Sequence, residues 1–284
     1  MSATGQGSPE PTGNDRPATG RSAAGRTLAD RASLRSDANW LIRGTAVVAR
    51  TVTRCLARVR ISGALDAVPR EGPLIIVSNH VSNADGVLVG AWLTPRLGRR
   101  IHWLGKREMT EWPLVGPFVL AGSVHPVDRE NVDIDVFRLL LRILEAGNVV
   151  VVFPEGTRSA TGGMQAAKDG VAMLALRSDA RILPVGVVDT DRFWPKGKLP
   201  RLGGHVEMRV GEPFKLSEVL PSGLDRRAAK VAATDLIMRR IAALLPARQQ
   251  GVYGPPAVSP EPAADVAADL AAEPDPGVSA PRVR

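Results

Sequence analysis

The chain has 284 residues, of which 44 % are hydrophobic and 23 % are charged, a composition typical of a folded protein with one substantial domain. Its single cysteine, Cys55, excludes a disulfide within the chain and favours an intracellular protein. The formal net charge of +8 suits an anionic partner, but aromatic residues make up only 4 % and no zinc-ligand spacing or helix-turn-helix pattern occurs. An anionic lipid surface is therefore expected, and no nucleic acid.

The two ends of the chain differ in composition from its middle. Residues 1–33 are rich in Gly, Ser, Ala, Thr and Pro, and residues 249–284 are rich in Pro and Ala with scattered acidic residues. Both ends are predicted to be disordered, because they have too few large apolar side chains to form a core. Residues 34–248 are predicted to form one domain.

The domain is predicted to begin with an amphipathic helix within residues 34–60. At about 100° per residue, apolar side chains form one stripe and arginines lie on the opposite side. The stripe comprises Leu41, Val48, Val52, Cys55, Leu56 and Val59, and the arginines are Arg43, Arg50, Arg54 and Arg58. Such a helix either packs on the domain or anchors the protein at a membrane interface, and the sequence leaves both open. Cys55 is expected to serve packing rather than to act as a nucleophile.

No apolar run reaches the length of about eighteen residues that spans a membrane, and the N-terminus lacks the apolar stretch of a signal peptide. The sequence therefore predicts neither a transmembrane helix nor a signal peptide. We expect a peripheral protein on the cytoplasmic face of the cell membrane.

His80 and Asp85 are predicted to flank a turn between a strand and a helix. The apolar run at 73–77 indicates a short buried strand, and the apolar stretch at 86–93 indicates the helix. Side chains at such a turn project from the end of a sheet, the usual place for a site in an α/β fold. A carboxylate beside one imidazole nitrogen fixes the tautomer, and the other nitrogen can then take a proton from an alcohol. The alternative is a histidine that only hydrogen-bonds within its own turn.

A second polar loop follows the apolar run at 149–153, which indicates a strand buried on both faces. A proline ends this strand, and Gly156 permits a tight turn. Glu155, Thr157 and Arg158 are therefore expected on a loop at the carboxyl end of the strand. The guanidinium of Arg158 suits phosphate oxygens, while a Glu155–Arg158 ion pair that merely closes the turn is the structural alternative.

The remaining elements alternate along the chain. Further strands are predicted at 59–65, 101–104, 123–127, 182–188 and 206–210, and further helices at 112–120, 133–146, 168–177 and 225–245. Strands that alternate with helices indicate an α/β fold, with a mixed, mostly parallel sheet covered by helices.

The segments 79–85 and 153–159 resemble, in order, two motif blocks of the glycerolipid acyltransferase family. The segments 122–129 and 181–185 resemble two further blocks, and the resemblance covers roughly residues 60–215. It implies the glycerol-phosphate acyltransferase fold. It also implies transfer of a fatty acyl chain from a thioester, on coenzyme A or acyl carrier protein, to the sn-2 hydroxyl of lysophosphatidic acid. Phosphatidic acid, a phospholipid precursor, is the implied product.

The resemblance also implies roles for single residues. His80 acts as the general base and Asp85 orients it. The implied phosphate-binding residues of the acceptor site are Arg158, Arg129 and Lys106, and the supporting loop comprises Glu155, Gly156 and Thr157. The alcohol attacks the thioester directly, so neither a metal nor a cofactor beyond the thioester co-substrate is expected.

Two other readings stay open. The same chemistry could act on another lysophospholipid or lipid alcohol, because the motif blocks do not determine the acceptor. A non-catalytic membrane lipid-binding protein is the alternative from another class. A serine hydrolase is disfavoured, since the sequence contains no Gly-x-Ser-x-Gly motif.

Overall fold

A computed structural model describes residues 40–106, 123–127, 134–195 and 198–255. The predicted helix at 112–120, Arg129 and the predicted tail at 1–33 lie outside these residues. So does most of the predicted tail at 249–284.

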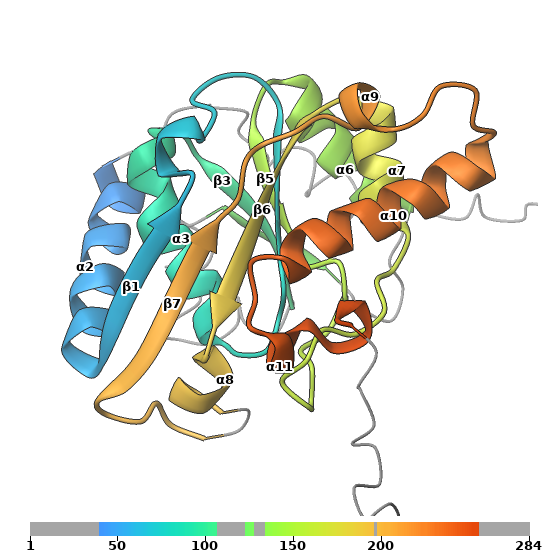
Figure 1. Ribbon diagram of the computed structural model, residues 1–284. Coiled ribbons are helices and arrows are strands. Elements are labelled where there is room, and N and C mark those ends of the chain that lie inside the picture. Colours follow the sequence, from blue (N-terminus) through green and yellow to red (C-terminus); the bar gives the residue numbers. More distant parts are fainter. Residues whose placement is uncertain (1–39, 107–122, 128–133, 196–197, 256–284) are drawn as a thin grey trace, which may run out of the picture. The chain divides into compact units, whose positions relative to one another are not determined.

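A seven-stranded sheet forms the centre of the domain, with the strand order β1-β7-β6-β2-β5-β3-β4 (Figure 1). Its strands are β1 (Ala57–Gly63), β2 (Leu74–Ser78), β3 (Ile101–Lys106), β4 (Val124–Val127), β5 (Val149–Val152), β6 (Arg181–Val188) and β7 (Gly204–Val210). Every neighbouring pair is parallel except β6 and β7. The predicted α/β fold with a mixed, mostly parallel sheet is confirmed.

Helices cover both faces of this sheet (Figure 1). One face carries α2 (Trp40–Leu56), α3 (Ala84–Leu97) and the short α8 (Thr190–Phe193), and the other carries α6 (Ile134–Glu145), α7 (Gly170–Ser178) and α10 (Arg226–Ala242). Smaller elements are α9 (Leu216–Val219), α11 (Ala247–Gln250) and the 3-10 turns η1 (Leu65–Ala67) and η2 (Gly251–Tyr253).

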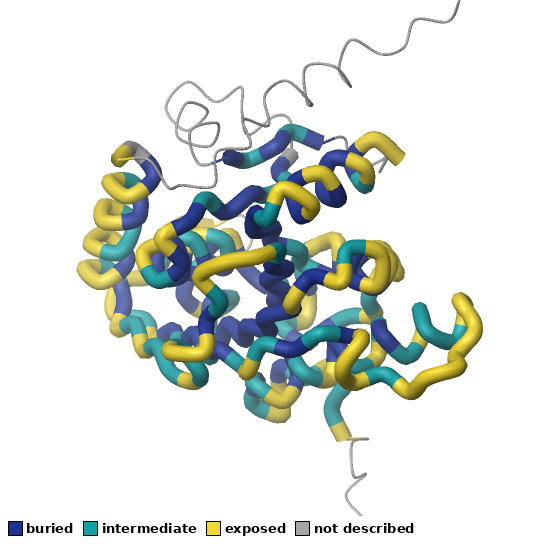
Figure 2. The backbone as a smooth tube through the Cα atoms, turned by 90° about the horizontal axis from the view of Figure 1, so that it is seen from above, coloured by how far each residue is buried: buried dark blue, intermediate teal, exposed yellow. Residues whose placement is uncertain are grey.

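The central strand β2 contributes to the cores on both faces. Ile75 and Val77 pack under α6, α7 and α10, whereas Leu74 and Ile76 pack under α3. This alternation follows from the two-residue period of a strand, and it explains why β2 is apolar without interruption. Figure 2 shows the buried residues gathered in the interior and the exposed residues on the outer turns of the helices.

The packing face of α2 differs from the predicted apolar stripe. α2 packs on α3, and the buried residues of α2 are Ile42 and the smaller Ala46 and Thr53. Val48 and Val52, from the predicted stripe, are 62 % and 50 % exposed. Cys55 is exposed as well, so its expected packing role is wrong. The short side chains allow the two helices to approach closely, which a count of large apolar residues does not register.

The domain also extends beyond its predicted end at 248. Gln249 is fully buried, and the hydroxyl of Tyr253 accepts a hydrogen bond of 3.0 Å from the backbone N–H of Ala167. These residues pack beside the loop that follows β5, so residues 249–253 belong to the folded domain and not to the predicted tail. Among the described residues, no helix is long and apolar enough to cross a membrane.

Candidate active site

The parallel pairing of β2 with β5 brings the two predicted motif loops together. Leu74 to Val77 pair with Val149 to Val152, so both strands end at the same edge of the sheet. Two hydrogen bonds then join the loops. The backbone N–H of Ser159 donates to the carbonyl of His80 at 2.8 Å, and the backbone N–H of His80 donates to the Glu155 carboxylate at 2.9 Å.

His80 and Asp85 form a hydrogen-bonded pair. The Nδ1 atom of His80 lies 2.9 Å from Oδ2 of Asp85, and the Asp85 side chain is fully buried. Because an ionised carboxylate can only accept, Nδ1 carries the proton, and Nε2 is left as the basic nitrogen. The imidazole is also stacked on the ring of Phe153, with the ring centroids 4.1 Å apart. The pair therefore has the geometry that a general base and its orienting carboxylate require.

The Asp85 carboxylate is held from every side by hydrogen-bond donors. Its Oδ2 also accepts from the backbone N–H groups of Val81 and Ser82, at 2.7 and 2.8 Å. Its Oδ1 accepts from the hydroxyl of Thr190 at 2.6 Å. Thr190 comes from α8, directly after β6, and sequence reasoning missed it. The available signal was a hydroxyl residue at the carboxyl end of a strand that was predicted to lie in the same sheet.

Glu155 links the two loops through backbone groups. Its carboxylate is almost entirely buried and accepts from the N–H of His80 at 2.9 Å and from the N–H of Gln165 at 3.0 Å. Burial raises the pKa of this carboxyl above its ordinary value, while the two backbone donors partly counteract the effect. Glu155 makes no ion pair with Arg158, although the structure describes both side chains.

Arg158 instead reaches the turn that carries His80. Its Nη1 donates to Oδ1 of Asn83 at 2.6 Å, and Asn83 is an exposed residue of the turn that carries His80. Gly156 and Thr157, beside it, are exposed on the loop. Gly156 has a φ of +72°, and a Cβ there would lie 3.0 Å from the side chain of Lys168. The turn therefore requires a glycine at this position.

Of the other two predicted phosphate-binding residues, Lys106 and Arg129, the structure describes only the backbone position of Lys106. Lys106 is the last residue of β3, which runs parallel to β5, so it lies at the same edge of the sheet as the two loops. Arg129 lies outside the described residues.

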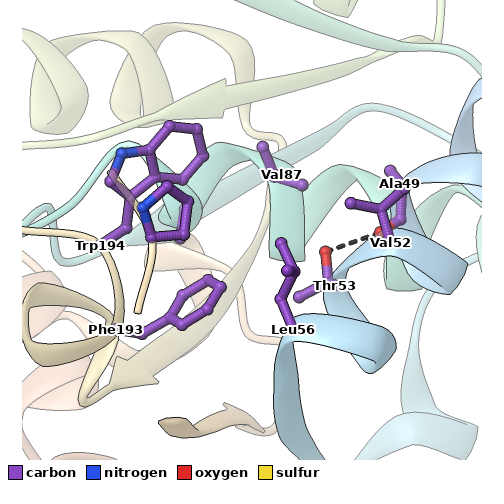
Figure 3. A pocket seen from close by; sticks show the side chains of 9 residues that line it. Ala49, Val52, Thr53, Leu56, Val87, Phe193 and Trp194 are labelled. Carbon is purple, nitrogen blue, oxygen red and sulfur yellow. Dashed lines mark hydrogen bonds between the residues drawn. The ribbon is translucent and has the colours of Figure 1, made fainter. Parts of the chain in front are cut away.

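An apolar groove lies between α2, the first turn of α3 and the segment around α8 (Figure 3). Its walls are formed by Ala49, Val52, Thr53, Leu56, Ala84, Val87, Phe193, Trp194 and Pro200. The Thr53 hydroxyl donates to the carbonyl of Ala49 at 2.6 Å, so even this polar group is satisfied within its own helix. One of its lining residues, Ala84, directly precedes Asp85 in the chain.

The chain is similar in sequence and fold to known acyltransferases. The sequence model of the Acyltransferase family matches residues 58–188. A 1-acyl-sn-glycerol-3-phosphate acyltransferase of Bacillus subtilis is 25 % identical over 177 residues, which are 61 % of this chain and 82 % of that protein. A protein of the same name from Limnanthes alba is 34 % identical over 128 residues, 43 % of each chain.

A human 1-acyl-sn-glycerol-3-phosphate acyltransferase alpha is 29 % identical over 191 residues, 64 % of each chain. The match thus spans most of the Bacillus relative, but less than half of the Limnanthes relative and less than two thirds of the human one. The solved 1-acyl-sn-glycerophosphate acyltransferase of Thermotoga maritima shares the fold, with a TM-score of 0.57 and 23 % identity over 72 % of this chain and 79 % of that one. Residues 58–188 thus match the Acyltransferase family in sequence, and the sheet that carries their motif loops has the fold of a solved acyltransferase.

Proposed function

We propose that the protein transfers a fatty acyl chain from a thioester to the sn-2 hydroxyl of lysophosphatidic acid, which gives phosphatidic acid. The observation that carries the proposal is the His80–Asp85 pair, oriented by a fully buried carboxylate and adjoining the Arg158 loop. The names of the relatives support the choice of a 1-acyl-sn-glycerol 3-phosphate as the acceptor.

The chemistry follows from the free nitrogen of His80. Nε2 removes the proton of the sn-2 hydroxyl while the oxygen attacks the thioester carbonyl, and Asp85 stabilises the imidazolium that forms. The C–S bond then breaks, the new ester remains on the acceptor, and the imidazolium returns the proton to the departing thiolate. The reaction passes through no acyl-enzyme and uses the thioester, on coenzyme A or acyl carrier protein, as its only co-substrate.

In this proposal the acceptor phosphate binds at Arg158, beside the turn that carries His80. Arg158 offers a planar pair of donors for phosphate oxygens, and Asn83 holds the guanidinium beside the catalytic turn. Arg129 and Lys106 complete the phosphate site in this proposal. In this proposal the groove takes a fatty acyl chain, since its walls are apolar and include Ala84, the residue before Asp85.

The outward face of α2 is assigned to a membrane surface. It exposes Trp40, Val48 and Val52 together with the arginines Arg43 and Arg54. Apolar and basic side chains on one exposed helix are typical of binding at the interface of an anionic bilayer. Val52 also forms a wall of the groove, so this face and the groove are continuous. In this proposal a lipid chain enters the groove from the bilayer.

The test is to measure thiol release from an acyl thioester with lysophosphatidic acid, with the monoacylglycerol that lacks its phosphate, and with no acceptor. We expect rapid release and phosphatidic acid formation only with the first. Release without an acceptor would indicate a hydrolase. Faster reaction with a different lysophospholipid would assign another acceptor, and no release with any lipid would leave a lipid-binding protein.

A further inference from the structure

Thr190 links the segment 187–194 to the turn at residues 79–85, which carries His80 and Asp85 and is called the catalytic turn below. The Asp85 carboxylate has two oxygens with different partners. Oδ2 is hydrogen-bonded to His80 Nδ1 and to two backbone N–H groups. Oδ1 accepts a hydrogen bond of 2.6 Å from the Thr190 hydroxyl. Both side chains are fully shielded from solvent, so water is not available to replace this donor.

The hydroxyl of Thr190 helps to fix the plane of the carboxylate. Terminal torsions of this kind are broad, so rotation about the Cβ–Cγ bond is opposed mainly by the donors on the two oxygens, three on Oδ2 and Thr190 on Oδ1. With Thr190 bound to Oδ1, Oδ2 remains directed at Nδ1 of His80. Without the hydroxyl, a buried oxygen loses its donor, and rotation toward other donors would weaken the bond to the imidazole.

The turn before Thr190 is held by two residues of α11. The residue before it, Asp189, has a φ of +60°, in the left-handed region. This turn is held by Arg248, which pairs with the Asp189 carboxylate, and by Gln249, whose Oε1 accepts from the Asp189 N–H at 3.3 Å. Both residues belong to α11, so the last described helix supports the position of the Thr190 hydroxyl.

Two other side chains of the catalytic turn reach the same segment. Asn79 pairs with both backbone groups of Val187, at 3.0 and 2.8 Å, and the Ser82 hydroxyl donates to the carbonyl of Trp194 at 2.8 Å. The catalytic turn and the segment 187–194 are therefore joined at three points, of which only the bond from Thr190 reaches Asp85.

We propose that Thr190 is a positioning residue of the acyl transfer, which acts by holding Asp85 in the orientation that His80 requires. The inference rests on the proposed function for its kinetic consequences, but its geometric part concerns the free protein.

The test compares Thr190→Val, which keeps the shape of the side chain and removes the hydroxyl, with Thr190→Ser, which keeps the hydroxyl. We expect the valine variant to lose about ten- to a hundredfold in kcat, the effect of one hydrogen bond to a charged group, with KM for both substrates nearly unchanged. The serine variant should recover most of this loss. In an Asp85→Asn background, Thr190→Val should cost little more, because the carboxylate it positions is already gone.

Two controls separate this role from a purely structural one. Thr234→Val removes a hydroxyl that bonds only the carbonyl of Lys230 on α10, and it should leave kcat unchanged. The nitrogen and proton NMR signals of the His80 ring, recorded without substrate, should shift in Thr190→Val and return in Thr190→Ser. If these ring signals are the same in the wild type and the valine variant, the inference is wrong, whatever reaction the protein catalyses. If they shift but no acyl transfer is found, the proposed function fails and the positioning role stands.

Discussion

At the scale of single residues, the catalytic turn is held by buried carboxylates and backbone N–H groups. Asp85 accepts from the N–H groups of Val81 and Ser82, and Glu155 accepts from those of His80 and Gln165. Backbone donors do not titrate, and they are oriented by the sheet that ends beside them. The position of His80 is therefore determined by the strands β2 and β5 rather than by flexible surface charges.

Removal of the base should abolish most of the activity. His80→Ala is expected to lower kcat about a hundred- to ten-thousandfold, because a positioned base accelerates proton transfer by this factor. Asp85→Asn should have a similar effect, since an amide can favour the wrong tautomer of the imidazole. His205→Ala, which changes an exposed histidine of β7, is the matched control and should remain fully active. Retention of more than about a tenth of wild-type kcat by His80→Ala would refute its role as the base.

Arg158 should affect the acceptor and not the donor. Arg158→Ala removes a charge-assisted hydrogen bond to phosphate, which contributes about 1.5–3 kcal/mol, so KM for lysophosphatidic acid should rise about ten- to a hundredfold. KM for the thioester should change little. The monoacylglycerol without a phosphate provides the comparison. If its reaction slows as much as that of lysophosphatidic acid, Arg158 supports the loop through Asn83 instead.

At the scale of elements, the sequence predicts the strands well and the surfaces poorly. Every strand of the sheet is predicted within a few residues. The central strands β2 and β5 are continuous apolar runs, and the outer strands β1 and β7 alternate apolar and polar side chains. The sequence leaves open whether the apolar stripe of α2 packs on the domain, and it does not indicate the face that does, because that face includes small residues such as Ala46 and Thr53. The sequence does not predict α8, because a helix of a single turn has no periodicity. It does not predict the role of Thr190 either, because Asp85, the partner of its hydroxyl, lies 105 residues earlier.

The exposed face of α2 can be tested against its own buried face. Val48 is 62 % exposed and Ala46 is 6 % exposed, although they are neighbours on the same helix. Val48→Asp should release the protein from anionic liposomes and leave its melting temperature nearly unchanged, because it weakens only the contact with lipid. Ala46→Asp should instead lower the melting temperature, since it buries a charge against α3.

Two further observations would complete this liposome experiment. Binding of the wild-type protein should fall as the salt concentration rises, because the arginines of α2 attract anionic headgroups. If Val48→Asp binds liposomes as well as the wild type does, the membrane-facing surface lies elsewhere on the domain.

At the scale of the whole molecule, a buried histidine pair should make stability depend on pH. His102 of β3 and His125 of β4 lie with Nδ1 and Nε2 3.0 Å apart. Burial, their mutual repulsion and the nearby Arg100 lower the pKa of His102 to about 3, and burial with Arg100 lowers the pKa of His125 to about 4. Both are therefore neutral in the folded protein near neutral pH.

The sign follows from the unfolded chain, in which histidines take up protons below about pH 6.5. Protonation then favours the unfolded state, so the free energy of unfolding should fall as the pH is lowered from about 6.5 toward 4. Urea unfolding at several pH values measures this slope. In a His102→Gln, His125→Gln double variant the free energy of unfolding should depend less on pH. His205→Gln, which changes an exposed histidine, is the control and should keep the wild-type dependence. An unchanged slope in the double variant would assign the acid sensitivity to other groups.

The strand order has a consequence for how the protein is made. β1, near the start of the described chain, pairs with β7, and β2 lies between β5 and β6. A ribosome releases these partners late, so the sheet cannot close while the chain is still being synthesised. The support for Asp85 arrives later still, because Thr190 is fixed by Arg248 and Gln249 of α11. A nascent chain therefore carries both motif loops long before it can catalyse, and a product truncated before α11 should lack a correctly oriented base even where its sheet has formed.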